Sequence, residues 1–226
     1  MRRIIAFFIL AAVKCGSTLL YRGKFTWITH TPEDPWARAR LVVFMNHTSL
    51  FEPLFIQHLS FATLWHLAAH MNVPGADITL DRPIVGAFWK LMIPGIASIT
   101  RRRDNSWDNY IASIKEDSVI IIAPEGRMKR PNGLDKFGKP MTVRGGVADI
   151  MEQIKDGGMI LCLSGGLHHV QSPGQHLPRI FKTISMNFVY LDIASYRKQF
   201  SSNPRQRKIQ IVKDLQERLE KNCPKA

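Results

Sequence analysis

Short runs of apolar, β-branched residues alternate along the chain with stretches in which apolar positions recur every three or four residues. The clearest run is residues 119–123, where four β-branched residues in a row are soon followed by Pro124 and Gly126. This pattern predicts a buried strand with a sharp end. Similar runs predict strands at residues 41–45, 95–100, 159–163 and 184–190, and helical spacing predicts helices at residues 50–59, 106–116, 147–154 and 201–221.

Strands that alternate with helices are typical of an α/β fold. We therefore expect a mixed, largely parallel central sheet flanked by helices. In such sheets, binding sites form where strands end and loops begin. Three residues, His47, Arg101 and Glu125, each lie just past a predicted strand, so we expect them to face one cleft.

The N-terminus carries ten apolar residues, at positions 4–13, between two arginines and Lys14. Spanning a bilayer takes roughly 20 apolar residues, so the run is too short for a regular span. A secretory signal is disfavoured because no small-residue cleavage site follows. We predict a membrane-interface helix at residues 1–22 and a single domain at residues 23–226, with an apolar first helix docked on the core as the alternative.

The length of 226 residues suits one domain, and the net charge of +13 predicts an acidic partner. Anionic lipid, a phosphorylated substrate or an acidic carrier protein would each fit. Nucleic acid is not expected, because no helix-turn-helix, zinc-finger or RNA-binding signature accompanies the charge. Three widely spaced cysteines, Cys15, Cys162 and Cys223, show neither a disulfide framework nor zinc spacing, which favours a reducing compartment.

The stretch F-M-N-H-T-S-L-F-E-P, residues 44–53, has two interpretations. In the first, His47 is a general base that Glu52 orients. In the second, Ser49 and Glu52 form a helix capping box and the histidine is incidental. Pro53 favours the first interpretation, because proline prefers the first helical turn and would leave Glu52 at a poor capping position. The pattern alone leaves the two open.

Two basic motifs follow predicted strands further along the chain. In the first, Gly95 opens a strand that leads into Arg101, and the planar guanidinium of arginine suits phosphate oxygens. In the second, Glu125 and Gly126 end the strand at residues 119–123, and Arg127 comes next. Backbone N–H groups beside a glycine, with cations alongside, form an anion-binding loop. Taken singly, each motif also fits a solvated surface turn.

Together, in this order and spacing, the three motifs resemble the glycerophospholipid acyltransferase family, typified by the 1-acylglycerol-3-phosphate acyltransferases. Asn46, His47 and Glu52 match the family's N-H-x4-D motif, with glutamate for the usual aspartate. Gly95 and Arg101 match the second motif, and residues 124–126 match the P-E-G of the third. The sequence departs at residues 127–129, where Arg-Met-Lys replaces the usual Thr-Arg-Ser.

The resemblance implies a glycerol-3-phosphate acyltransferase-like fold, and an enzyme of phospholipid biosynthesis at the cytoplasmic face of the cell membrane, peripheral or monotopic. His47, oriented by Glu52, would activate a lysophospholipid hydroxyl toward the thioester of acyl-CoA or acyl-carrier protein. Arg101, Glu125, Gly126 and Arg127 would bind the acceptor. No cofactor and no metal are implied. The changed third motif keeps open a different lysolipid acceptor, such as a lyso-aminolipid. The glutamate in place of aspartate keeps open a non-catalytic lipid-binding relative.

Other candidate residues carry weaker signals. His168 and His169 are predicted in a loop that lines the cleft or contacts a headgroup. His66 and His70 have the spacing of zinc ligands on a helix but lack a third ligand nearby, so packing is the preferred interpretation. Six aromatic residues, mostly expected in the core, are candidates for an acyl tunnel: Phe51, Phe55, Phe61, Trp65, Phe88 and Trp89.

Overall fold

A computed structural model describes residues 1–100, 102, 104–172, 175 and 177–225. Its centre is a seven-stranded sheet with the order β1-β7-β6-β2-β5-β3-β4. The strands are β1 (Arg22–Trp27), β2 (Ala39–Met45), β3 (Met71–Ala76), β4 (Gly95–Ile99), β5 (Val119–Ile122), β6 (Gly158–Ser164) and β7 (Thr183–Asp192). The β6–β7 pair is antiparallel and the other neighbouring pairs are parallel. The predicted α/β class with a mixed, largely parallel sheet is confirmed.

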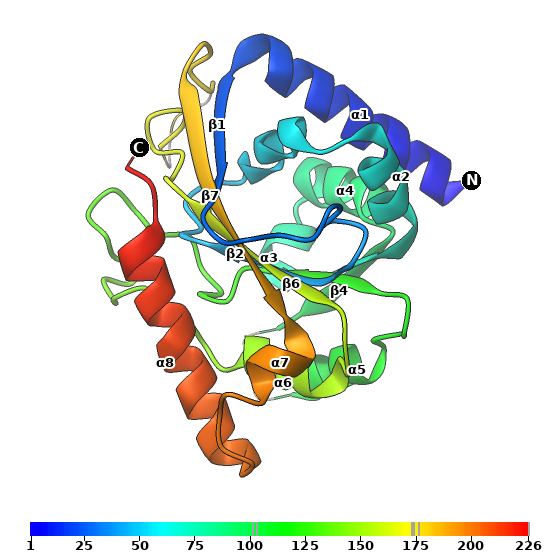
Figure 1. The fold of residues 1–226 in the computed structure, drawn as a ribbon. Helices are drawn as coiled ribbons and strands as arrows, with labels where there is room; N and C mark the ends of the chain where they lie inside the picture. The colour runs from blue at the N-terminus through cyan, green and yellow to red at the C-terminus, as the bar shows by residue number, and fades with distance from the viewer. Residues whose placement is uncertain (101, 103, 173–174, 176, 226) are drawn as a thin grey trace.

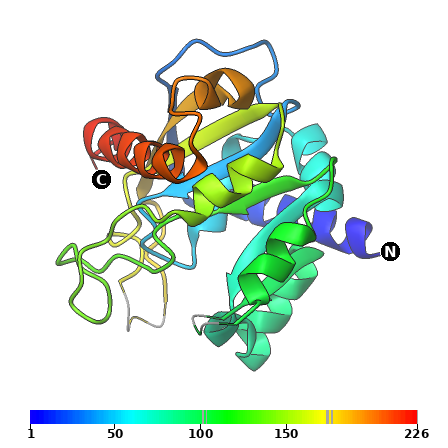
Figure 2. The ribbon, with the colours of Figure 1, turned by 90° about the horizontal axis from the view of Figure 1, so that it is seen from below.

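Helices cover both faces of the sheet, as Figures 1 and 2 show. On one face lie α1 (Arg2–Leu20), the 3₁₀ helix η1 (Glu52–His58), α2 (Phe61–His70), α3 (Asp77–Leu80) and α4 (Pro83–Met92). On the other lie α5 (Ser106–Ala112), α6 (Gly146–Gln153), α7 (Ile193–Arg197) and α8 (Pro204–Asn222).

The alternation of side chains along a strand divides the core into two apolar clusters. In β2, Val42 packs toward the α1 and α2 face, whereas Leu41 and Val43 pack toward α6 and α8. Every residue of β6 is buried. A strand covered on both faces needs apolar residues at successive positions. The central strands were therefore the easiest to predict from the sequence.

Several element bounds differ from the sequence prediction. The helix expected at residues 50–59 is the 3₁₀ helix η1, with Glu52 and Pro53 in its first turn. The helix expected at residues 106–116 is shorter, because α5 ends at Ala112. The sequence prediction missed β1, β3, α2, α3, α4 and α7.

Helix α1 packs along the domain through one side only. Ala6, Leu10 and Ser17 are buried, whereas Phe8 and Leu19 are 65% and 78% exposed. Polar side chains also fix the helix to η1, since Lys14 Nζ donates to the carbonyl of Gln57 at 2.5 Å and Ser17 Oγ to that of Leu54 at 2.7 Å. The helix is long and apolar enough to cross a membrane by length and composition, with a mean hydropathy of 1.8.

Candidate active site

The candidate site begins at the C-terminal end of β2, where Asn46 adopts a left-handed backbone conformation with φ of 62°. Asparagine tolerates this conformation better than most residues. The backbone N–H of Asn46 donates to Glu125 Oε1 at 2.6 Å, and its side-chain Nδ2 donates to the carbonyl of Ser164 at 2.8 Å. The turn is therefore held by the loop after β5 and by the last residue of β6, the two strands that flank β2.

The turn brings His47 to Glu52. Nδ1 of His47 lies 2.5 Å from Oε2 of Glu52. The other carboxylate oxygen, Oε1, accepts the backbone N–H groups of Thr48 at 2.7 Å and Ser49 at 3.3 Å. The two interpretations of this stretch are thus partly compatible, because one oxygen reaches back to the backbone as in a capping box and the other holds the imidazole.

The capping box is incomplete, however. Ser49 Oγ accepts from the N–H of Phe51 at 3.1 Å, not from Glu52, and η1 has no side-chain cap at its first turn. The geometry therefore favours the orientation of His47 as the main role of the Glu52 carboxylate.

The electrostatics of the pair suit a base. Burial lowers the pKa of His47, but the charge and hydrogen bond of Glu52 and the charge of Glu125 outweigh burial and raise it above the ordinary value. Because the carboxylate accepts at Nδ1, the neutral ring carries its proton there and leaves a lone pair on Nε2. Within the described residues, Nε2 has no hydrogen-bond partner.

Glu125 stabilises the turn at Asn46. Its side chain is buried, and burial raises the pKa of its carboxyl group. One oxygen accepts from Asn46, and the other, Oε2, has no partner within the described part of the chain. The contact of Glu125 that the structure shows is therefore with the backbone of Asn46.

Gly126 and Arg127 continue this loop in different directions. Gly126 has φ of +67°, a region that favours glycine, and it lines the same cavity as His47 and Glu52. The Arg127 guanidinium instead forms an ion pair with Asp135 and lies 4.6 Å above the ring of Phe137. Hydrogen bonds from the Lys139 backbone and from Arg127 lower the pKa of Asp135 to about 2. Arg101, the remaining predicted binding residue, lies outside the described residues.

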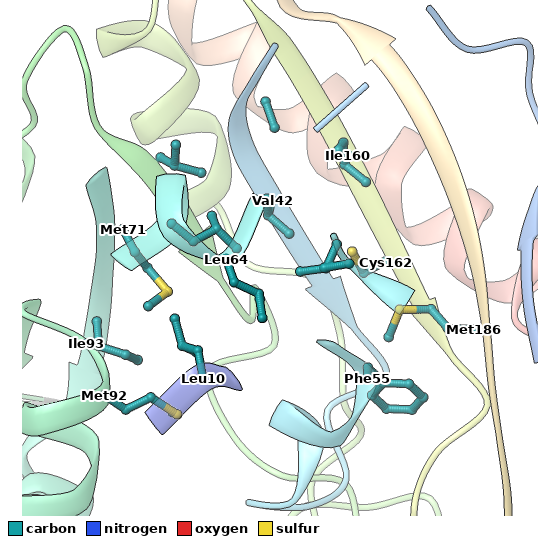
Figure 3. Packing of buried hydrophobic residues seen from close by; sticks show 14 of the residues in the cluster. Leu10, Val42, Phe55, Leu64, Met71, Met92, Ile93, Ile160, Cys162 and Met186 are labelled. Atoms are coloured by element: carbon teal, nitrogen blue, oxygen red, sulfur yellow. The ribbon is translucent and has the colours of Figure 1, made fainter. Parts of the chain in front are cut away.

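An apolar cavity of about 310 Å³ opens beside His47, Glu52 and Gly126. Leu10, Leu67, Met71, Met92 and Ile93 line its part between α1, α2 and α4, and Figure 3 shows most of these side chains close together. Of the six aromatic residues considered for a tunnel, Phe55 and Trp89 line the cavity. The other four lie outside its lining.

The other four histidines considered from the sequence lie away from the cavity lining. Nε2 of His168 bonds to the carbonyl of Lys129 at 2.7 Å, and Nε2 of His169 to that of Thr183 at 2.7 Å. Neither lines the cavity. His66 and His70 lie with ring centroids 4.6 Å apart, and no group of three possible metal ligands occurs among the described residues.

Lys129 is a site residue whose position the sequence did not indicate. Its backbone N–H donates to the carbonyl of His47 at 2.7 Å, and its Nζ lies 3.4 Å from Asn46 Oδ1. The basic run after Gly126 was the available signal, but the run alone did not distinguish Lys129 from Arg127.

Comparison with known proteins identifies the class. The family model described as Acyltransferase matches residues 27–164, more than half of the chain and the part that holds His47, Glu52 and Glu125. The chain therefore belongs to the acyltransferase family.

A solved structure shares the fold. It is the 1-acyl-sn-glycerophosphate (LPA) acyltransferase PlsC from Thermotoga maritima, which is 18% identical in sequence. The match has a TM-score of 0.55 and covers 99% of this chain and 83% of that one. No curated protein matches the chain in sequence.

We predict that Glu52→Gln moves the acid limb of the pH–activity profile. An amide removes the charge that stabilises the His47 imidazolium, so the pKa of His47 falls and the limb shifts to lower pH. The loss of orientation lowers kcat by about 10²- to 10⁴-fold. Acyl transfer measured from pH 5 to 9 checks both effects.

The matched control is Asp117→Asn, since Asp117 pairs with His70 at 3.1 Å on the surface. This variant should keep the wild-type profile. If Glu52→Gln has the same acid limb in its pH–activity profile as wild type, the pairing of Glu52 with a catalytic His47 is contradicted.

Proposed function

We propose that the protein transfers a fatty acyl group from a thioester donor to a hydroxyl of a lysophospholipid such as 1-acylglycerol 3-phosphate. The observation that carries this proposal is the 2.5 Å contact between His47 and Glu52 at the edge of an apolar cavity. The pair supplies a base, and the cavity supplies an environment for a hydrocarbon chain. Membership of the acyltransferase family and a fold like that of PlsC agree with this activity.

In the proposed reaction, Nε2 of His47 takes the proton of the acceptor hydroxyl. The oxygen attacks the thioester carbonyl, a C–O bond forms, and the C–S bond breaks as the tetrahedral intermediate collapses. His47 then returns the proton to the thiolate that leaves. Glu52 holds the ring at Nδ1 throughout and stabilises the imidazolium between the two proton transfers.

No covalent acyl-enzyme is needed in this scheme. Of the three cysteines, Cys162 lines the cavity, but burial raises the pKa of its thiol far above the usual range. A buried thiol of this kind is a poor nucleophile. The donor is acyl-CoA or acyl-carrier protein, both of which are acidic and suit a chain with a net charge of +13.

The test is acyl transfer from labelled acyl-CoA or acyl-carrier protein to a panel that includes lysophosphatidic acid, lysophosphatidylethanolamine and lyso-aminolipids. Wild type should acylate lysophosphatidic acid. His47→Ala should lose the activity, and Glu52→Asp should keep part of it because the carboxylate remains. Equal transfer by wild type and His47→Ala would refute the mechanism. A strict preference for a lyso-aminolipid would show that the acceptor is that lipid and not lysophosphatidic acid.

The cavity lining leads to a prediction on chain length. Met92 is buried in the wall of the cavity, at the side formed by α1 and α4. Met92→Ala removes side-chain volume there, so the preferred donor should become longer, since each buried methylene contributes about 0.8 kcal/mol. Competition among acyl-CoA donors of graded length measures the shift.

The matched control for chain length is Met151→Ala. Met151 is equally buried but belongs to the cluster on the opposite face of the sheet. This variant should lower stability, as core truncation does, and leave the preferred chain length unchanged. If both variants shift the preference alike, the cavity does not hold the acyl chain.

We also propose that the exposed side of α1 binds the membrane surface, at the cytoplasmic leaflet, without crossing the bilayer. The buried side of α1 and its two polar contacts to η1 fix it along the domain. Its exposed side presents Ile4 and Phe8, one helical turn apart, near Arg3. An apolar stripe beside cations is the pattern of an interfacial helix.

Deletion of α1 would expose the core around Leu10, so point substitutions are the better test. Ile4→Glu combined with Phe8→Glu should reduce sedimentation with anionic vesicles, because two charges would have to enter the interface. Ile209→Glu on α8, at an equally exposed apolar position, is the control and should bind as wild type does. Unchanged binding by the double variant would exclude this face.

A further inference from the structure

We propose that Arg144, together with Lys129, binds the phosphate of the acceptor. This inference rests on the proposed function and adds the residues that recognise the charged headgroup. Arg144 lies outside the acyltransferase motifs, and Lys129 stands where the third motif usually has serine. Arg144 lies in V-R-G-G, two residues before α6 begins, and 18 residues after Gly126 in the chain.

Binding of the acceptor phosphate needs another cation, because Arg127 is already engaged within its own loop. Its guanidinium is held by Asp135 and covered by Phe137. Asp135 in turn accepts backbone N–H groups from Phe137 at 2.7 Å and Lys139 at 2.9 Å. Arg127 thus stabilises the loop that follows Gly126, and releasing it to a substrate would leave a buried carboxylate without its counter-charge.

Arg144 approaches the same loop at Gly126. Its Cδ and Nε lie 3.7 and 3.8 Å from the point where a Cβ on Gly126 would stand. Its backbone N–H donates to the carbonyl of Pro124 at 3.0 Å, which fixes the base of the side chain beside the Pro124–Gly126 segment. Within the part of the chain that the structure describes, no acidic side chain pairs with its guanidinium.

Lys129 provides the second charge on the same loop. The bond from its backbone to the His47 carbonyl places it next to the catalytic histidine, and its Nζ reaches Asn46 Oδ1. An ammonium group has three donors, so a phosphate oxygen can be bound in addition to the asparagine. His168 keeps this segment in place through the Lys129 carbonyl.

Gly126 connects the two cations to the cavity: Arg144 approaches it, Lys129 follows it by three residues in the same loop, and Gly126 itself lines the cavity beside His47. A phosphate monoester bound by the planar fork of Arg144 and the ammonium of Lys129 would place the rest of the acceptor next to the imidazole. The absence of a side chain at Gly126 leaves room for this approach. Arg144 is thus assigned as a substrate-binding residue, not as part of the proton transfer.

The test compares two acceptors that differ only in the phosphate, 1-acylglycerol 3-phosphate and 1-acylglycerol, with the 226-residue chain on vesicles. Arg144→Gln should raise KM for the phosphorylated acceptor by about 10- to 100-fold, the range for a lost charged hydrogen bond. KM for acyl-CoA, which also carries phosphate, and transfer to 1-acylglycerol should remain as in wild type. Arg144→Lys should recover part of the loss.

Arg205→Gln is the matched control, because Arg205 is an exposed cation at the start of α8. This variant should leave KM for both acceptors and for acyl-CoA unchanged. An equal loss on both acceptors, a rise confined to KM for acyl-CoA, or no change in Arg144→Gln would each overturn the assignment.

A binding measurement separates failure of this inference from failure of the proposed function. Calorimetric titration with glycerol 3-phosphate needs no acyl transfer. If wild type transfers to neither acceptor but binds glycerol 3-phosphate, and Arg144→Gln does not bind it, the phosphate site stands while the proposed reaction fails. If both proteins bind glycerol 3-phosphate equally, or neither binds it, the assignment of Arg144 is wrong.

Discussion

The carboxylate of Glu52 connects the two requirements of the site, since one oxygen orders the backbone after β2 and the other holds the imidazole of His47. The proposed role of His47 as a base needs such a rigid loop, because a base must be held close to one geometry to accept a proton efficiently. Glutamate is one methylene longer than aspartate, and the turn into η1 accommodates it without loss of either contact. The orientation of His47 therefore depends on a local fold of six residues more than on distant packing.

The surrounding sheet supplies what this local fold cannot. Parallel pairing of β2 with β5 and β6 brings the ends of three strands together, so that Asn46 contacts both Glu125 and Ser164. The loop after β5 then returns to His47 through the backbone of Lys129. The charged part of the site lies at this strand edge, and the apolar cavity extends from it beneath α1, α2 and α4. A polar headgroup and a hydrocarbon chain could thus be bound at neighbouring places without either being buried in the wrong environment.

The sequence predicted the central strands well because their burial on both faces demands continuous apolar, β-branched runs. It missed β1, whose side chains are mostly exposed, and β3, which contains Pro74 and Gly75. The pairing of His47 with Glu52 was accessible from spacing, since both residues lie in one short segment. The position of Arg127 could not be predicted from spacing, because its ion pair with Asp135 depends on the conformation of the loop between them. The approach of Arg144 to Gly126 likewise depends on the packing of α6 against the sheet.

The most direct test of the central claim is the tautomer of His47, measured by nitrogen NMR on protein with ¹⁵N-labelled histidine and assigned by comparison with His47→Ala. The structure predicts that the neutral ring is protonated at Nδ1, with a low-field proton shared with Glu52, and that Nε2 is unprotonated above the pKa. A ring protonated at Nε2 in the neutral form would contradict the account, because that nitrogen could not then accept the proton of an acceptor hydroxyl.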